Sequence, residues 1–246
     1  TVYWDNNLIF NNYIETLYNE AIPEGAPLDG NGNPYLYSGP DGIQAKNGAT
    51  IKNNIFRVSK TSKYTSNQHP DMLQETGNFV KVYNNEFINC GDAIYQCGMY
   101  QRSEAHDIWI YNNVFRMTED FKWPDFFRLD VGSTPCTLIK NIKIFNNTIV
   151  DNPDYISIHF WGFTEGQNIE ASGNEIKNNI FVNCSPNSTY NPIISISKTP
   201  GIFPEGAFEF GNNIYIGSKE SPYITFNGTA YTITEWISQF EPTAKT

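Results

Sequence analysis

The stretch Val80-Lys-Val-Tyr-Asn-Asn-Glu-Phe-Ile-Asn-Cys90 decides the fold, because nearly the same phrase returns along the whole chain. Its centre is the doublet Asn84-Asn85, followed by one residue and then an aromatic or aliphatic one. Such doublets recur at intervals of 28 to 34 residues after a first interval of 47. Self-similarity at a period of about 20 to 50 residues is typical of stacked supersecondary units, so a solenoid is predicted. The doublets are Asn6-Asn7, Asn53-Asn54, Asn84-Asn85, Asn112-Asn113, Asn146-Asn147, Asn178-Asn179 and Asn212-Asn213.

Each doublet is flanked by short apolar runs. Ile108-Trp-Ile-Tyr111 precedes one doublet with period-two alternation, and Val114-Phe115 follows it. This alternation, rich in Ile, Val and aromatic residues, indicates strands. Two strands joined by a doublet cannot keep the same chain direction within one sheet, so the doublet marks a sharp bend between two sheets. Asn tolerates the left-handed conformation that such a bend requires. If every coil bends at the same place, the Asn side chains stack into an amide ladder.

A third strand completes each coil. Segments roughly 12 to 15 residues before most doublets read as a turn residue followed by a strand. The unit is therefore three short strands, and the predicted architecture is a right-handed parallel β-helix of about seven coils. The Asp residues that lead these segments are expected to be turn caps, since they recur in coil after coil. These segments are Asp41–Gln44, Asp71–Gln74, Asp92–Tyr95, Asp125–Arg128, Asp154–Ser157 and Pro192–Ser195.

The sequence Asp92-Ala-Ile-Tyr95, a loop, and then Ile108-Trp-Ile-Tyr-Asn-Asn-Val-Phe115 resembles the parallel β-helix repeats of the pectate-lyase-like superfamily. The resemblance covers roughly residues 1 to 226. It implies an extracellular protein that handles a polysaccharide, as a lyase, a glycoside hydrolase, or a non-catalytic attachment module like those of phage tailspikes and adhesins. A purely structural or truncated β-helix is a further alternative. The resemblance is compatible with a monomer or a homotrimer.

Length and composition favour one elongated domain over residues 1–246. Residues 11–40, rich in Pro and Gly, are expected to form a long loop insertion. Residues 227–246 are expected to cap the end of the tube through a short helix near Thr234–Phe240, with Thr232 or Thr234 as its N-cap. The first strand already reads like the middle of a coil, so the sequence is expected to be a mature or truncated product.

The net charge of −10, from 16 basic and 26 acidic residues, argues against nucleic acid or an anionic membrane as partner. No apolar run is long enough for a membrane span, so no membrane insertion is predicted. Of the four cysteines, Cys97 and Cys136 lie on neighbouring coils and could form a disulfide. The alternative is four buried or half-buried thiols.

Candidate site residues come from the outward positions of the Asp-led strand, since the groove of the resembling proteins generally lies along that sheet. If Phe127 and its equivalents, Ile156 among them, point inward, one outward column contains Gln44, Gln74, Tyr95, Arg128, Ser157 and Ser195. The next contains Lys46, Thr76, Cys97, Asp130, His159 and Ser197. We therefore predict a catalytic group of Tyr95, Arg128, Asp130 and His159. The predicted substrate-binding residues are Gln44, Gln74, Phe126, Tyr155 and Trp161.

Two chemistries fit this group. A β-eliminating lyase would use His159 or Tyr95 as base and Arg128 to neutralise a uronate carboxylate. A hydrolase would pair Asp130 with a second acid. The candidates for that acid are Asp71, Asp92, Asp125, Glu104, Glu119 and Asp120. No cofactor is assigned from the sequence. Calcium at Asp92 and Asp125 is the alternative considered, although a site of six or more oxygen ligands is not evident in the sequence.

Overall fold

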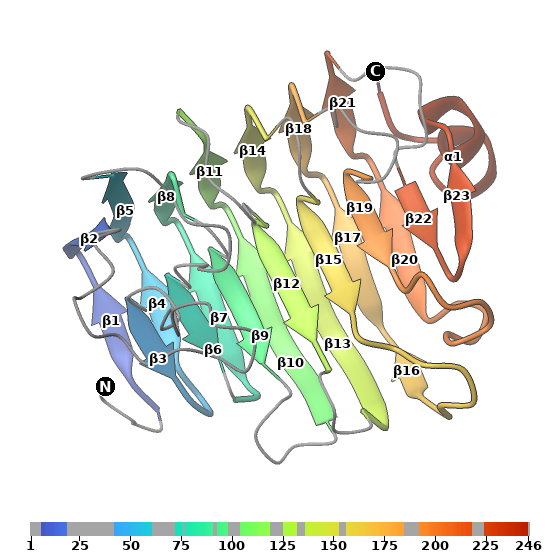
Figure 1. Ribbon diagram of the computed structural model, residues 1–246, viewed down its shortest axis with the longest axis horizontal. Coiled ribbons are helices and arrows are strands. Elements are labelled where there is room, and N and C mark those ends of the chain that lie inside the picture. Colours follow the sequence, from blue (N-terminus) through green and yellow to red (C-terminus); the bar gives the residue numbers. More distant parts are fainter. Residues whose placement is uncertain are drawn as a thin grey trace, which may run out of the picture.

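The structure is a computed structural model, which describes residues 6–18, 42–60, 72–75, 77–90, 93–97, 104–118, 125–131, 136–152, 156–184, 192–217 and 224–245. Its described strands form three sheets that run along the length of the molecule, and successive strands of each sheet come from successive coils (Figure 1). Among the described strands, all pairs are parallel except the last, between β22 and β23. The chain is therefore a parallel β-solenoid, as the repeat predicts.

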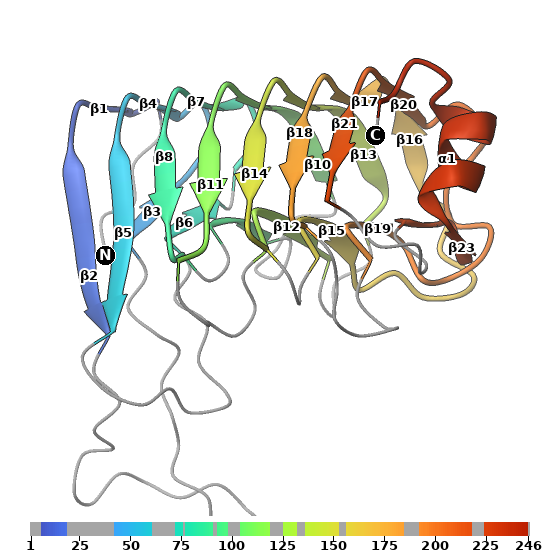
Figure 2. The same cartoon turned by 90° about the horizontal axis from the view of Figure 1, so that it is seen from above.

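Sheet I lies before the Asn doublets and sheet II after them; sheet III is built by the Asp-led strands. Figure 2 shows the strands of sheet II side by side along the molecule. Sheet I contains β1 (Leu8–Phe10), β4 (Thr50–Lys52), β7 (Val80–Tyr83), β10 (Glu104–Tyr111), β13 (Leu138–Phe145), β17 (Asn174–Lys177) and β20 (Phe208–Gly211), with β16 (Glu170–Ser172) beside β13. Sheet II contains β2 (Tyr13–Tyr18), β5 (Ile55–Lys60), β8 (Glu86–Ile88), β11 (Val114–Arg116), β14 (Thr148–Val150), β18 (Ile180–Val182) and β21 (Ile214–Ile216). Sheet III contains β3 (Ile43–Ala45), β6 (Leu73–Glu75), β9 (Ile94–Cys97), β12 (Phe127–Asp130), β15 (Ile158–Trp161), β19 (Ile194–Ile196), β22 (Ile224–Phe226) and β23 (Thr229–Tyr231).

The interior of the tube is filled by equivalent side chains stacked from coil to coil. In sheet II, Phe56 stacks on Phe87 with ring centroids 4.9 Å apart, and Phe181 stacks on Tyr215 at 5.3 Å. All four are buried. Each coil contributes only a few such residues. The hydrophobic stabilisation of the folded state therefore depends on neighbouring coils, which bury one another's faces.

The predicted amide ladder is present at the bend between sheets I and II. At each step the backbone N–H and the side-chain Nδ2 of one Asn donate to the Oδ1 of the next, over 2.8–3.1 Å. The Nδ2 group also donates to a carbonyl of sheet I, as Asn147 does to Ile110 at 3.0 Å. The rungs are Asn12, Asn54, Asn85, Asn113, Asn147, Asn179 and Asn213.

The first residue of each ladder doublet adopts the left-handed conformation that the sequence predicts. Their φ values lie between 55° and 56°, at Asn11, Asn53, Asn84, Asn112, Asn146, Asn178 and Asn212. The two members thus have separate tasks: the first turns the backbone and the second bonds along the solenoid axis.

The start of the chain differs from the prediction in two ways. The first rung is Asn12 of the doublet Asn11-Asn12 rather than Asn7, because β2 follows this doublet and pairs with β5. The predicted loop over residues 11–40 is therefore wrong for its first part, where β2 forms Tyr13–Tyr18. The rest of that segment, residues 19–40, lies outside the described residues.

The C-terminal cap is α1 (Ile233–Phe240), which closes one end of the tube (Figures 1 and 2). Thr232 is its N-cap and forms a capping box with Glu235, in agreement with the sequence. Trp236 is buried against Phe210, with ring centroids 4.7 Å apart. In the described part of the chain, no helix has the length and apolarity that crossing a membrane requires.

Glu241 ends the amide ladder. Its buried carboxylate accepts from the backbone N–H and Nδ2 of Asn213 at 2.8 and 2.6 Å, and from Tyr215 Oη and Trp236 Nε1 at 3.0 and 2.9 Å. Burial, with the carboxylate nearby, raises the pKa of the Tyr215 phenol well above its usual value. One side chain therefore joins the last rung to the capping helix.

Replacement of Glu241 by alanine is expected to lower the free energy of unfolding by roughly 3 kcal/mol or more, because four buried donors lose their acceptor at about 1–3 kcal/mol each. Glu241→Gln is expected to lower the free energy of unfolding by less. Its side-chain carbonyl can still accept from Asn213, although its NH2 group would face the N–H donor of Trp236. Urea unfolding would measure both, with the exposed Glu205→Ala as control. Equal stability of Glu241→Ala and the control would contradict this role.

The pairing of Cys97 with Cys136, one of the two alternatives that the sequence left open, does not form, because Cys136 carries a free thiol. Cys90 and Cys184 are also free and buried, as the alternative interpretation has it. Burial raises the pKa of the Cys136 thiol to about 11 and that of Cys184 to about 12.

Alkylation is expected to spare these thiols in the native protein. The thiolate is the reactive form, and a raised pKa leaves little of it at mildly alkaline pH. Cys90, Cys136 and Cys184 should therefore react with iodoacetamide only after unfolding, as peptide masses would show. Rapid native labelling of Cys184 would contradict the burial found here.

Candidate functional site

The outward face of sheet III brings four predicted site residues together, in a register that differs from the prediction. Arg128 on β12 is the direct neighbour of His159 on β15, and Asp130 is the neighbour of Trp161. The prediction placed His159 beside Asp130 instead, two residues out of register. The cause is that Ile158, not Ile156, aligns with Phe127.

The bend before β12 and β15 determines where Phe126 and Ser157 lie. The backbone N–H groups of Phe126 and Phe127 both donate to the Ser157 carbonyl at 3.0 Å, so Ser157 occupies the bend position of its coil. At the bend, consecutive residues both turn inward, and period-two alternation fails. Phe126 is consequently fully buried against Phe115, with centroids 5.8 Å apart, rather than exposed for substrate stacking.

Asp125 holds His159. Its Oδ2 lies 3.0 Å from His159 Nδ1, and both side chains are buried. An ionised carboxylate can only accept, so Nδ1 carries the proton of this bond and Nε2 of the neutral ring is left with its lone pair. His159 Nε2 is buried and has no hydrogen-bond partner. A histidine oriented in this way is the arrangement of a general base.

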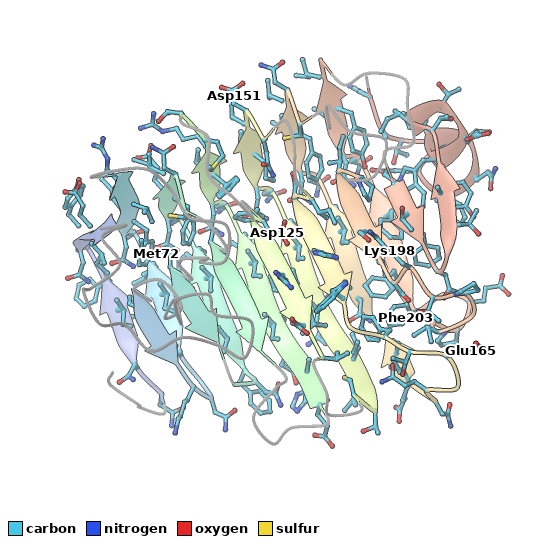
Figure 3. The ribbon with its side chains drawn as sticks, viewed as in Figure 1. Met72, Asp125, Asp151, Glu165, Lys198 and Phe203 are labelled. Carbon is cyan, nitrogen blue, oxygen red and sulfur yellow. The ribbon has the colours of Figure 1, made fainter. Side chains whose placement is uncertain are left out.

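Arg128 lies between an acid and an aromatic ring. Its Nη2 is 3.4 Å from Asp130 Oδ2, and its guanidinium carbon is 5.1 Å from the centre of the Trp161 ring. Trp161 is 46% exposed and lies 6.4 Å from the His159 ring. A planar cation behind an exposed indole is a cation–π arrangement that fixes the ring. We call Asp125, Arg128, Asp130, His159 and Trp161 the β12–β15 cluster; Figure 3 labels Asp125 near the middle of the molecule.

The other predicted site residues are placed only in part. Tyr95 pairs with Arg128 across β9 and β12, and Gln44 pairs with Gln74, as the predicted column requires. The side chains of these three residues, and the whole of Tyr155, lie outside the described residues. The sequence analysis considered Asp125 only as a second acid or as a calcium ligand and did not expect it to bond to His159, because it belongs to a recurrent turn column.

Both described acids of the cluster already have basic partners, Asp125 with His159 and Asp130 with Arg128. Glu104 lies on β10 of sheet I, so it is not a second acid for this face. The remaining candidate acids, Asp71, Asp92, Glu119 and Asp120, lie outside the described residues, as does the Asp92 half of the suggested calcium pair. Among the residues that the structure describes, no group of three or more His, Cys, Asp or Glu side chains could hold a metal ion.

The fold and cluster define a parallel β-solenoid with a buried Asp–His pair on its outward face. Comparison of the chain with protein-family models, with curated proteins and with solved structures found no match in any of the three.

Proposed function

We propose that this protein is an extracellular carbohydrate-active enzyme of the pectate-lyase-like class, which cleaves a polysaccharide lying across sheet III. The observation that carries the proposal is the Asp125–His159 pair, in which the buried Nε2 of His159 has no hydrogen-bond partner. His159 is the register partner of Arg128, and its ring lies 6.4 Å from that of Trp161. Elimination is favoured over hydrolysis, because both described carboxylates are engaged by basic side chains rather than placed as an acid pair.

In the proposed reaction, a sugar ring stacks on the exposed face of Trp161. Arg128 contacts the uronate carboxylate and favours the charge that develops there when the neighbouring proton leaves. His159 Nε2 takes that proton, the electron pair forms the C4–C5 double bond, and the C4–O bond to the next sugar breaks. Asp125 keeps the ring in the tautomer that can accept.

The test is incubation with a panel of polyuronates and neutral polysaccharides, with and without calcium. Unsaturated products are followed by ultraviolet absorbance, and new reducing ends by a colorimetric assay. Wild-type protein is expected to yield unsaturated products, and His159→Ala to lose them.

The chain offers a matched control in His106, which also contacts a carboxylate, Asp107, at 2.8 Å but lies in sheet I. His106→Ala should retain activity. Reducing ends without unsaturation would overturn elimination in favour of hydrolysis. Binding without any product, weakened by Trp161→Ala, would favour a non-catalytic attachment module.

A further inference from the structure

Ser195 is the neighbour of His159 on the side away from Arg128. The two residues are register partners across β15 and β19, so their side chains leave the same face of sheet III. Ser195 is fully buried, and its Oγ has no hydrogen-bond partner. His159 Nε2 shares this property, so two unsatisfied polar atoms occur on adjacent strands at the same level.

Such a pair requires an explanation, because buried polar atoms in folded proteins are nearly always hydrogen-bonded. The neighbouring serines obey the rule. Ser157 Oγ accepts from Asn152 Nδ2 at 3.2 Å, and Ser197 Oγ donates to the Thr199 carbonyl at 3.0 Å. The Ser195 hydroxyl is thus set apart from the serines around it.

The order of groups across the strands is carboxylate, imidazole, hydroxyl. Asp125 is hydrogen-bonded to His159 Nδ1. Ser195 lies on the next strand, and the backbones of neighbouring strands are about 4.8 Å apart. Nucleophile and base are often further apart in an unliganded site than in the reacting complex. The three residues therefore follow one another in the order of a catalytic triad, an arrangement that is independent of position in the chain.

We infer that Ser195 is the nucleophile of a second activity, the hydrolysis of O-acyl esters carried by polysaccharide hydroxyl groups. Ser195 Oγ bonds to the acyl carbon while His159 Nε2 takes its proton. The C–O bond to the sugar then breaks, and His159 returns the proton to the leaving sugar oxygen. Water, deprotonated by His159, attacks the acyl-serine; the carboxylic acid leaves and the Ser195 hydroxyl is restored.

This activity goes beyond the proposed elimination, since it breaks an acyl C–O bond and not the chain of sugars. An uncharged ester also suits a chain of net charge −10 and a cluster with two carboxylates and one guanidinium. The two reactions share His159 but not Ser195. Substitution of Ser195 therefore separates them.

The first experiment is covalent labelling with a fluorophosphonate probe, which reacts with activated serines, followed by peptide mass mapping of the full chain. The expected label is on Ser195, lost in Ser195→Ala and reduced at least 100-fold in rate in His159→Ala. Ser157→Ala, which replaces a serine at the bend before β15 whose hydroxyl is already bonded, should label like wild type. Absence of label on Ser195 in the folded wild-type protein would overturn the inference.

The second experiment measures ester hydrolysis with p-nitrophenyl acetate and release of acetate from acetylated polysaccharides. Ser195→Ala should abolish both while leaving any elimination activity intact. Loss of elimination in Ser195→Ala, with unchanged ester hydrolysis, would show that Ser195 is not the nucleophile of the esterase reaction. If no polyuronate is cleaved but Ser195 is labelled and esters are hydrolysed, the proposed elimination fails and this inference stands.

Discussion

Replacement of Asn147 by alanine is expected to lower the free energy of unfolding by about 3–5 kcal/mol, because three buried groups lose partners at roughly 1–3 kcal/mol each. The groups that lose a partner are the N–H and Nδ2 of Asn113, which donate to Asn147 Oδ1, and the Ile110 carbonyl, which accepts from Asn147 Nδ2. Asn147 is fully buried, so water cannot replace the lost bonds. Chemical denaturation, followed by tryptophan fluorescence and circular dichroism, would measure the change.

The neighbouring residue provides the control. Asn146 is exposed and has φ of 55°, so Asn146→Gly keeps the bend and is expected to change stability by less than about 1 kcal/mol. Asn12→Ala gives a second comparison, since this rung lies at the exposed end of the ladder and should cost less than Asn147→Ala. Similar losses for Asn147→Ala and Asn146→Gly would show that the ladder contributes little.

The repeat predicted the fold because its physical requirements recur in each coil. The doublet Asn-Asn indicates a residue in the left-handed conformation followed by a buried amide. Its seven occurrences show where sheets I and II meet. The first rung was misassigned, since Asn6-Asn7 and Asn11-Asn12 satisfy the same local rule. Only the pairing of β2 with β5 distinguishes them, and that pairing is not a local property.

The site was predicted less well than the fold, because it depends on the bend that precedes sheet III. A two-residue period says which residues share a face only while the backbone stays extended. Phe126 and Ser157 sit where it does not, and one predicted binding residue, Phe126, is buried as a result. His159 lies beside Arg128 rather than Asp130 because the partner of Phe127 is Ile158, 31 residues further on, whereas the equivalence of the Asp125 and Asp154 segments implied 29. Residues on the regular strand, Arg128 and Asp130, were placed as expected relative to each other.

Asp125 shows a different limit of sequence reasoning. Recurrence of Asp along a column indicates a turn role, and nothing local marks one member as different. What sets Asp125 apart is the histidine that the next coil places 3.0 Å from its carboxylate. A turn residue becomes part of a site when the neighbouring coil supplies its partner.

Asp125→Asn is expected to reduce the turnover of the proposed reactions at His159 by roughly 10²–10⁴-fold while the protein stays folded. The reason is that His159, the base, loses the group that fixes its tautomer. The carboxylate can only accept from Nδ1, whereas an amide can also donate to it and so leave the proton on Nε2. Asp125 is thus a positioning residue, and its effect should pass through His159. Accordingly, the double substitution Asp125→Asn with His159→Ala should be no slower than His159→Ala alone.

A spectroscopic readout tests the same step without any substrate. The chain contains three histidines, so ¹⁵N chemical shifts of the His159 ring can be assigned by comparison with His159→Gln. In the wild type we expect the neutral ring to carry its proton on Nδ1, and in Asp125→Asn to shift toward protonation on Nε2. An Nε2-protonated ring in the wild type would mean that the atom proposed to act on Ser195 and on the substrate is a donor. Neither proton abstraction nor activation of the Ser195 hydroxyl could then begin at His159.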